Sequence, residues 1–212
     1  MACKLICVSS DDGADAFSAA TEVAEKLGWR LVDEDIVSRA AEEAGVGREA
    51  VADVERRKSL VERLLDSVST PGASMAYVPT LAESVTGPRS DVLRGMIRSV
   101  IEDVAARGDA VIVAHAASLA LGARDGVLRV LITASPAIRA RRLAATLDVD
   151  EKEATRMLAR SEANRADYIK RFYGVADESP VLYDLVINTD RLSAGQAAAL
   201  ILQAAGETMR SA

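Results

Sequence analysis

The sequence contains few of the residues on which several classes of protein depend. Its 212 residues include two cysteines, one histidine and only 3% aromatic residues. A four-ligand zinc site is therefore improbable, and so is a base-stacking RNA-binding sheet. No apolar run approaches the roughly 20 residues of a membrane span, and the N-terminus lacks the pattern of a signal peptide. The net charge of −6 argues against a protein that coats nucleic acid. We expect a cytoplasmic protein that binds neither nucleic acid nor a membrane.

The two cysteines, Cys3 and Cys7, lie in one short apolar segment. If that segment is a strand, both side chains lie on one face, about 13 Å apart. That separation is too large for a disulfide. We therefore expect both residues to be reduced thiols.

Apolar runs alternate with helical patterns along the chain. The predicted strands are residues 4–8, 30–32, 110–114, 127–133 and 185–188. The predicted helices are residues 14–27, 35–44, 48–67, 91–107, 136–147, 151–160, a further piece to about 172, and 193–209. The strands are continuous apolar runs, which is typical of a parallel sheet covered on both faces. The sequence thus predicts an α/β fold: a parallel five-stranded sheet with helices on both faces. Ligands of such sheets bind at the carboxyl ends of the strands.

Several short segments occur in an order and spacing that resemble the cytidylate-kinase-like family of P-loop kinases. They are residues 31–36 (LVDEDI), 111–117 (VIVAHAA), 128–132 (LRVLI), 139–143 (RARRL), 165–168 (RADY) and 183–189 (YDLVINT). The resemblance implies the fold of the P-loop nucleoside monophosphate kinases, with residues 1–212 as a single domain. Its core would be about residues 1–35, 99–138 and 172–212, its nucleotide-monophosphate-binding segment about 36–98, and its lid about 139–171. The implied activity is transfer of the γ-phosphoryl group of ATP to CMP, dCMP or a related nucleotide, with Mg²⁺.

The loop that would bind the ATP phosphates departs from that pattern. Such a loop needs small residues, a lysine for the β- and γ-phosphates, and a hydroxyl for Mg²⁺. Gly13 aligns with a loop glycine, but Asp15 aligns with the next glycine, Ala16 with the lysine and Phe17 with the hydroxyl residue. A carboxylate about 6 Å from one phosphate charge costs roughly 3 kcal/mol at an effective dielectric constant of 20. We therefore expect ATP and Mg²⁺ to bind weakly or not at all.

Other residues complete the implied cofactor site. Ser10 and Ala14 belong to the same loop, and Thr189 and Arg191 belong to the turn that would pass the adenine. The acidic side chains of the loop leave two interpretations open. Asp11, Asp12 and Asp15 either form a solvated acidic loop at a helix N-terminus, or hold a metal ion that in turn holds phosphate. We favour the first and predict no metal site.

The resemblance also assigns cations of the lid to phosphate groups. Arg139, Arg142 and Arg165 would act in catalysis and Arg160 at the substrate. Arginine suits this role because its guanidinium group contacts phosphate in a bidentate manner. The alternative is that these arginines are exposed helix residues paired with nearby acids, namely Glu151, Glu153 and Glu162.

Two further residues match the implied substrate site. Asp33 matches an acid at the end of the second strand, although Glu34 replaces a basic residue beside it. His115 stands where the family has a phosphate-binding arginine, so it is either a structural histidine or a weakened substrate contact.

These observations favour a pseudo-kinase: a cytidylate-kinase-like protein with impaired or absent ATP phosphotransfer. It would bind a nucleotide or another anion, or serve as a scaffold. The first alternative is an active nucleoside monophosphate kinase with unusual loop chemistry. The second is a structural partner in an assembly, which includes a homo-oligomer, with residues 48–67 as an interface helix.

Overall fold

A computed structural model describes residues 3–33, 88–113, 116–176 and 178–210. Within these residues, five strands form one sheet: β1 (Leu5–Ser10), β2 (Arg30–Asp33), β3 (Ala110–Val113), β4 (Val127–Thr133) and β5 (Leu185–Asn188). The strand order is β2-β3-β1-β4-β5, and all neighbouring strands are parallel. The predicted fold class is confirmed.

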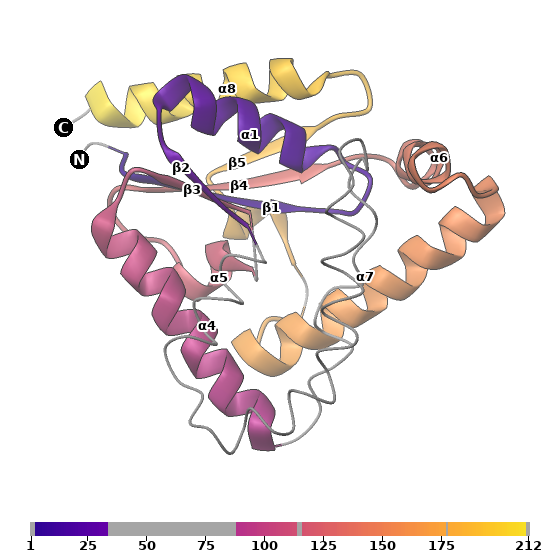
Figure 1. Cartoon of the computed structure of the whole chain (residues 1–212), viewed down its shortest axis with the longest axis horizontal. Coiled ribbons are helices and arrows are strands. Elements are labelled where there is room, and N and C mark those ends of the chain that lie inside the picture. Colours follow the sequence, from indigo (N-terminus) through magenta and orange to yellow (C-terminus); the bar gives the residue numbers. More distant parts are fainter. Residues whose placement is uncertain (1–2, 34–87, 114–115, 177, 211–212) are drawn as a thin grey trace.

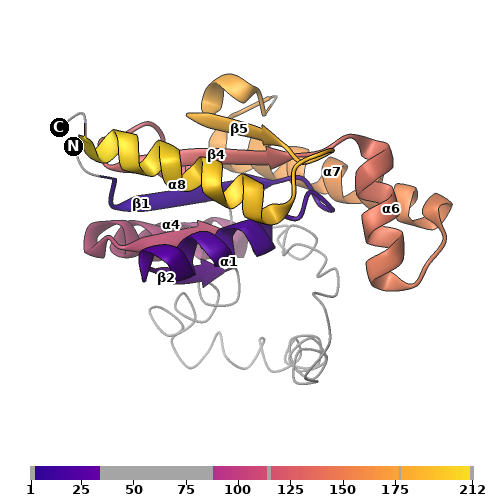
Figure 2. The ribbon, with the colours of Figure 1, turned by 90° about the horizontal axis from the view of Figure 1, so that it is seen from above.

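Helices lie on both faces of the sheet and beyond one end of it. The described helices are α1 (Ala16–Leu27), α4 (Pro88–Arg107), α5 (Ala117–Leu121), α6 (Pro136–Leu147), α7 (Glu151–Tyr173), α8 (Ala194–Arg210) and a 3-10 turn (Pro180–Leu182). Figure 1 shows α1 and α8 on one face and α4 and α5 on the other. Figure 2 shows α6 and α7 beyond the carboxyl ends of β1 and β4. This is the end at which ligands of parallel sheets bind.

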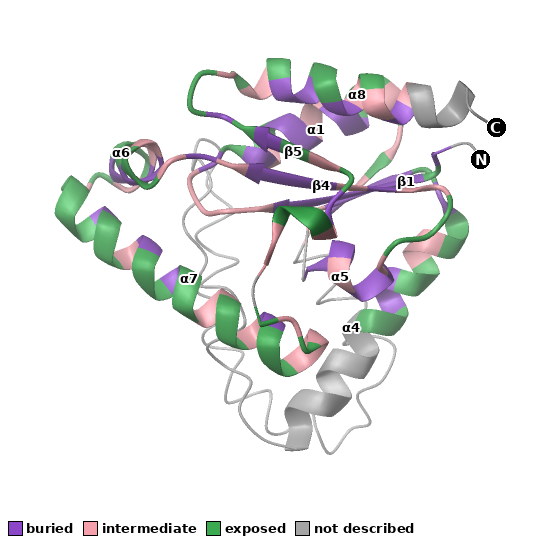
Figure 3. Ribbon diagram, turned by 180° about the vertical axis from the view of Figure 1, so that it is seen from behind, coloured by how far each residue is buried: buried purple, intermediate pink, exposed green. Residues whose placement is uncertain are grey.

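The central strand β1 is buried on both faces, which explains its unbroken apolar run. Ile6 and Val8 belong to the core cluster formed with α1 and α8. Leu5 and Cys7 belong to the cluster formed with α4 and α5. Figure 3 shows this central burial. A strand covered on two sides by helices has no solvent face on which polar residues could alternate.

The cysteines are both free and buried, but they do not share a face. Cys3 belongs to the cluster on the α1 side and Cys7 to the cluster on the α5 side. The expectation of a shared face was wrong because β1 begins only at Leu5, so strand alternation does not extend back to Cys3. Burial raises the pKa of the Cys7 thiol to about 12, which keeps it protonated and unreactive.

The helix boundaries differ from the prediction in the second half of the chain. Residues 151–173 form one continuous helix, α7, rather than two pieces. No glycine or proline lies near Arg160 to end a helix there. The short helix α5 was not predicted. The predicted helices 35–44 and 48–67, most of the expected nucleotide-monophosphate-binding segment 36–98, Glu34 and His115 lie outside the described residues.

Helices α6 and α7, which we call the lid helices because they contain the residues that the resemblance assigns to a lid, pack on each other through a small apolar cluster of their own. Its buried members are Ala140, Leu143, Ala144, Ala154 and Leu158. Asp150 begins α7 by accepting a hydrogen bond from the Glu153 amide at 2.8 Å, as an N-cap residue does. In the residues that the structure describes, no helix has the length and apolar character that crossing a bilayer requires.

Candidate functional site

The loop between β1 and α1 contains two residues in the left-handed backbone region, only one of which is a glycine. Gly13 has φ +78° and Asp15 has φ +61°, so both residues adopt left-handed conformations. Glycine adopts this region readily, whereas other residues do so rarely. Asp15 therefore holds a glycine-like conformation at the position where the sequence alignment placed a glycine. The first helical residue, Ala16, follows it directly.

Gly13 lies against the backbone of the first lid helix. A Cβ atom at this position would meet the Arg139 carbonyl oxygen at 2.8 Å and its Cα at 3.0 Å. Such a contact leaves no room for a side chain, and the obstacle is backbone. Gly13 is thus required for α6 to pack on the loop, independently of any phosphate.

Each acidic residue of the loop is bound by a hydroxyl group. Asp11 accepts a hydrogen bond from Thr133 Oγ1 at 2.5 Å. Asp12 accepts one from Ser161 of α7, and Asp15 accepts one from Ser18 at 2.6 Å. The described residues contain no group of three or more metal-ligating side chains of the His, Cys, Asp and Glu types. Asp11 and Asp12 therefore connect the loop to β4 and to α7. Neither of the two interpretations of the acidic loop includes such connections.

Arg139 is buried and donates hydrogen bonds to three acceptors. Its side chain is 6% exposed and pairs with Glu162. Its Nε donates to the carbonyl oxygen of Ala134 at 3.0 Å, and its Nη1 reaches that of Asp12 at 3.5 Å. Arg139 therefore pairs with Glu162, as the alternative interpretation states. It differs from that interpretation in being buried rather than exposed.

Arg142 connects the loop to the turn after β5. Its Nη1 donates to the Gly13 carbonyl at 3.3 Å and to Thr189 Oγ1 at 3.0 Å. Its Nη2 donates to the Thr189 carbonyl at 2.6 Å. Thr189 in turn donates to the Ala14 carbonyl at 2.9 Å. Carbonyl groups of the loop thus face cations of the lid.

Arg165 pairs in a bidentate manner with Glu178. Nε lies 2.8 Å from Oε2 and Nη2 lies 2.7 Å from Oε1. Tyr183 also donates its hydroxyl to Glu178. Burial acts to raise the pKa of Glu178, but the hydrogen bonds and charge of Arg165 hold that pKa below its ordinary value. Burial acts to lower the pKa of Arg165, but the hydrogen bonds and charge of Glu178, with smaller contributions from Tyr183 and Asp11, raise that pKa above its ordinary value.

The structure places the remaining predicted residues as follows. Ser10 ends β1, Ala14 and Ala16 are buried, and Phe17 is half-buried in the first turn of α1. Asp33 ends β2 and is half-buried, whereas Arg160 on α7 and Arg191 after β5 are exposed. Among the predicted site residues outside the loop, Arg139, Arg142 and Thr189 contact it through hydrogen bonds to Asp12, Gly13 and Ala14. That they bind a phosphate remains a prediction.

Three residues at this junction are not singled out by the sequence patterns: Ser161, Glu178 and Tyr183. Tyr183 opens the matched segment 183–189, and that position is the one signal that could have identified it. Ser161 and Glu178 carry no motif, because their roles depend on how α7 and the following segment fold back on β1.

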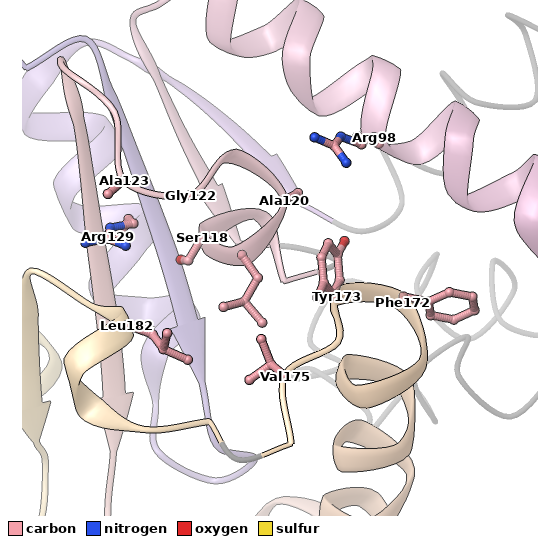
Figure 4. A pocket seen from close by; sticks show the side chains of 11 residues that line it. Arg98, Ser118, Ala120, Gly122, Ala123, Arg129, Phe172, Tyr173, Val175 and Leu182 are labelled. Carbon is pink, nitrogen blue, oxygen red and sulfur yellow. The ribbon is translucent and has the colours of Figure 1, made fainter.

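A separate cavity of about 450 Å³ lies on the side of the sheet that α4 and α5 cover (Figure 4). Its lining includes apolar side chains, the rings of Phe172 and Tyr173, and two arginines. Both arginines already have acidic partners: Arg98 has Glu102 at 3.3 Å and Arg129 has Asp184 at 2.6 Å. None of the loop or lid residues described above lines this cavity, so the junction between loop and lid is the candidate site.

Two solved structures of low sequence identity share this architecture. An uncharacterized protein from Eubacterium ventriosum has a TM-score of 0.68 and 15% identity, over 95% of this chain and 98% of that one. The TT1252 protein from Thermus thermophilus has a TM-score of 0.50 and 16% identity, over 98% of both chains. A shikimate kinase from Acinetobacter baumannii, solved with shikimate, has a TM-score of 0.49 and 16% identity, over 97% of this chain and 94% of that one.

No curated protein sequence matches the chain. The family comparison does match, and it covers residues 5–191, which include the loop, the lid and the turn after β5. The parallel sheet with helices on both faces is the fold expected from the resemblance. The chain belongs to the cytidylate kinase-like family.

Proposed function

We propose that this protein is a pseudo-kinase: a cytidylate-kinase-like protein with impaired or absent ATP phosphotransfer that binds an anion or nucleotide or serves as a scaffold. The observation that carries the proposal is the loop after β1. Its backbone keeps left-handed turns at Gly13 and Asp15. Its side chains supply a carboxylate, a methyl group and a ring at Asp15, Ala16 and Phe17. The loop therefore has two left-handed residues but lacks the lysine and the hydroxyl that a triphosphate needs.

ATP and Mg²⁺ do not fit the described residues of this loop. The lysine position holds Ala16, whose side chain is buried and carries no charge. Phe17 stands at the hydroxyl position, and the hydroxyl of the next residue, Ser18, already donates a hydrogen bond to Asp15 at 2.6 Å. Because a bound triphosphate needs a cation and an open set of N–H donors at once, this loop lacks the main contributors to its affinity. We therefore derive no catalytic step through ATP.

The lid arginines support a weaker anion-binding role. Arg139 and Arg142 donate to carbonyl groups of the loop, so part of their donor capacity is used within the protein. Arg165 on α7 already holds the Glu178 carboxylate in its fork. A nucleotide or another anion that enters here would compete with internal acceptors, which lowers its affinity.

The test is calorimetric titration with ATP and Mg²⁺, run in parallel on an active nucleoside monophosphate kinase. We expect no binding at micromolar concentration. A micromolar or tighter dissociation constant would overturn the proposal. A coupled assay for ADP formation with CMP and dCMP as acceptors addresses the alternative, an active kinase. Turnover at an ordinary rate, on the order of 1 s⁻¹ or more, would establish that alternative.

The scaffold role concerns partners rather than nucleotides. A mass measurement of the native protein distinguishes a homo-oligomer from a monomer. Location in the cytoplasm is part of the same proposal, supported by buried free thiols at Cys3 and Cys7.

A further inference from the structure

We propose that Glu178 is a resident anion in the lid, so that an external oxyanion binds Arg165 by displacing the Glu178 carboxylate. The inference rests on the proposed anion-binding role and adds a mechanism that controls it. The fork of Arg165 already holds the ligand it is shaped for, because two parallel N–H···O bonds of 2.8 and 2.7 Å engage both oxygens of one carboxylate.

Arg165 differs from the other two lid arginines in how its donors are used. Arg139 is 6% exposed, and two of its nitrogens donate to backbone carbonyls. The donors of Arg142 contact the Gly13 carbonyl and both oxygens of Thr189. These contacts belong to the frame of the site and cannot be exchanged without rearranging the backbone. Arg165 instead engages a side-chain carboxylate with two nitrogens, and its side chain is 27% exposed.

Glu178 is placed where a displaced carboxylate can move away. It lies between the end of α7 at Tyr173 and the 3-10 turn that begins at Pro180, outside both elements. Its side chain is 19% exposed. The hydroxyl of Tyr183 also donates to Glu178, at Oε1, the oxygen that Nη2 of Arg165 contacts as well. Tyr183 also contacts Ser9, which directly precedes the last residue of β1.

Exchange replaces one anionic partner of Arg165 by another and changes the surroundings of Glu178 and Tyr183. When a phosphate oxygen takes the fork, Glu178 loses its cationic partner, and leaving it buried would be unfavourable. The carboxylate must therefore turn toward solvent, and Tyr183 loses its acceptor. Occupancy of the lid is thereby communicated to the end of β1 through Tyr183 and Ser9.

The experiment measures binding of inorganic tripolyphosphate, without Mg²⁺ and at fixed ionic strength, by calorimetry. The variants are Glu178→Gln and a matched control, Glu153→Gln. The control removes the same charge from α7, where Glu153 pairs with the exposed Arg156 at 3.1 Å. We expect Glu178→Gln to bind tripolyphosphate roughly tenfold more tightly than the parent. The substitution removes the charged competitor for Arg165, and hydrogen bonds to a charged group are stronger than those to a neutral amide. We expect Glu153→Gln to bind as the parent does, within about twofold.

Two further variants make the result decisive. The gain should disappear in the double variant Glu178→Gln, Arg165→Gln, because the freed fork is then absent. Tyr183→Phe should give a gain of a few-fold, since it removes only the hydroxyl that holds Glu178, and it provides the test if Glu178→Gln fails to fold. Circular dichroism and thermal unfolding identify the folded variants.

The proposal is overturned if folded Glu178→Gln, or Tyr183→Phe in its place, binds tripolyphosphate no better than the parent. It is also overturned if the gain survives the loss of Arg165. Either result would make the pair a structural ion pair only. Tight ATP binding by the parent protein would instead refute the proposed function while leaving the exchange to stand, so the two failures are distinguishable.

Discussion

The hydroxyl of Thr189 lies 2.9 Å from the carbonyl oxygen of Ala14, which joins the turn after β5 to the loop after β1. Thr189 is 1% exposed. Its Oγ1 also accepts a hydrogen bond from Arg142 at 3.0 Å. One buried hydroxyl therefore links a strand end, the loop and the first lid helix.

We predict that Thr189→Val destabilises the protein by about 1–3 kcal/mol, because it leaves buried polar groups of Ala14 and Arg142 unsatisfied. Thr189→Ser keeps the hydroxyl and should retain most of the stability. Urea unfolding at equilibrium measures both variants. Equal midpoints for the two would show that the hydroxyl contributes nothing.

Gly13→Ala should be more damaging than an alanine at another left-handed glycine. At Gly13 the new Cβ meets the Arg139 carbonyl at 2.8 Å and the residue also has φ +78°. Gly28 has φ +66°, but nothing lies within 4 Å of a Cβ there. We expect Gly28→Ala to cost about 1 kcal/mol and Gly13→Ala to cost clearly more, since the lid must shift. Thermal unfolding of the matched pair provides the measurement, and equal losses would contradict it.

A third prediction concerns repair of the loop. The triple variant Asp15→Gly, Ala16→Lys and Phe17→Ser places a glycine at the left-handed position and adds the missing cation and hydroxyl. We expect it to gain measurable affinity for ATP, because the N-terminus of α1 follows directly. Each change alone should do little, since phosphate needs the open backbone and the cation together.

The structure refines the control for this repair. Phe17 is half-buried, whereas the fully buried residues of α1 are Ala16, Ala19, Ala20, Val23 and Ala24. Lysine at the buried Ala16 position is therefore the change most harmful to packing. A variant with only Asp15→Gly and Phe17→Ser separates loss of fold from loss of affinity. A folded triple variant that binds ATP no better than the parent would end the idea of a repairable loop.

The fourth prediction is a pH dependence at the pair of Arg129 and Asp184. Hydrogen bonds from Arg129 hold the pKa of Asp184 below its ordinary value. A carboxylate whose folded pKa is lowered stabilises the protein above its unfolded pKa, near 4, and loses that contribution as the pH falls through the folded pKa. Unfolding free energies between about pH 6 and about pH 3 should therefore decline less steeply in Asp184→Asn than in the parent.

The control for the pH experiment is Glu153→Gln, whose exposed pair with Arg156 should contribute little. Its profile should follow that of the parent. An Asp184→Asn profile parallel to the parent's would show that the pair adds nothing to acid stability.

Much of the fold follows from hydrophobic patterning. The apolar runs of β1 and β4, the second interrupted by Arg129, predict parallel strands covered on both faces, and both strands lie inside the sheet. The division of residues 151–173 into two helices was wrong because a polar stretch without glycine or proline carries no signal for a helix end. The short helix α5 escapes prediction because it has only five residues, too few to show a period.

The candidate site was less predictable than the fold. The loop and the lid arginines can be identified from motif order. The partners of these residues cannot, because Ser161 meets Asp12 across 149 residues of sequence and Glu178 lies outside every matched segment. Asp12 illustrates the difference: its carboxylate looks like a repulsive charge in the sequence, yet it accepts a hydrogen bond from Ser161 in the structure.

Helix α7 is continuous and connects two regions of the molecule. Its 23 residues span about 34 Å at 1.5 Å per residue. Ser161, near the middle, holds the loop, and Tyr173, at the end, lines the cavity beside α5. Both residues lie on one unbroken helix. The residue that holds the loop and the residue that lines the cavity are therefore kept about 18 Å apart along the helix axis, 12 residues at 1.5 Å each.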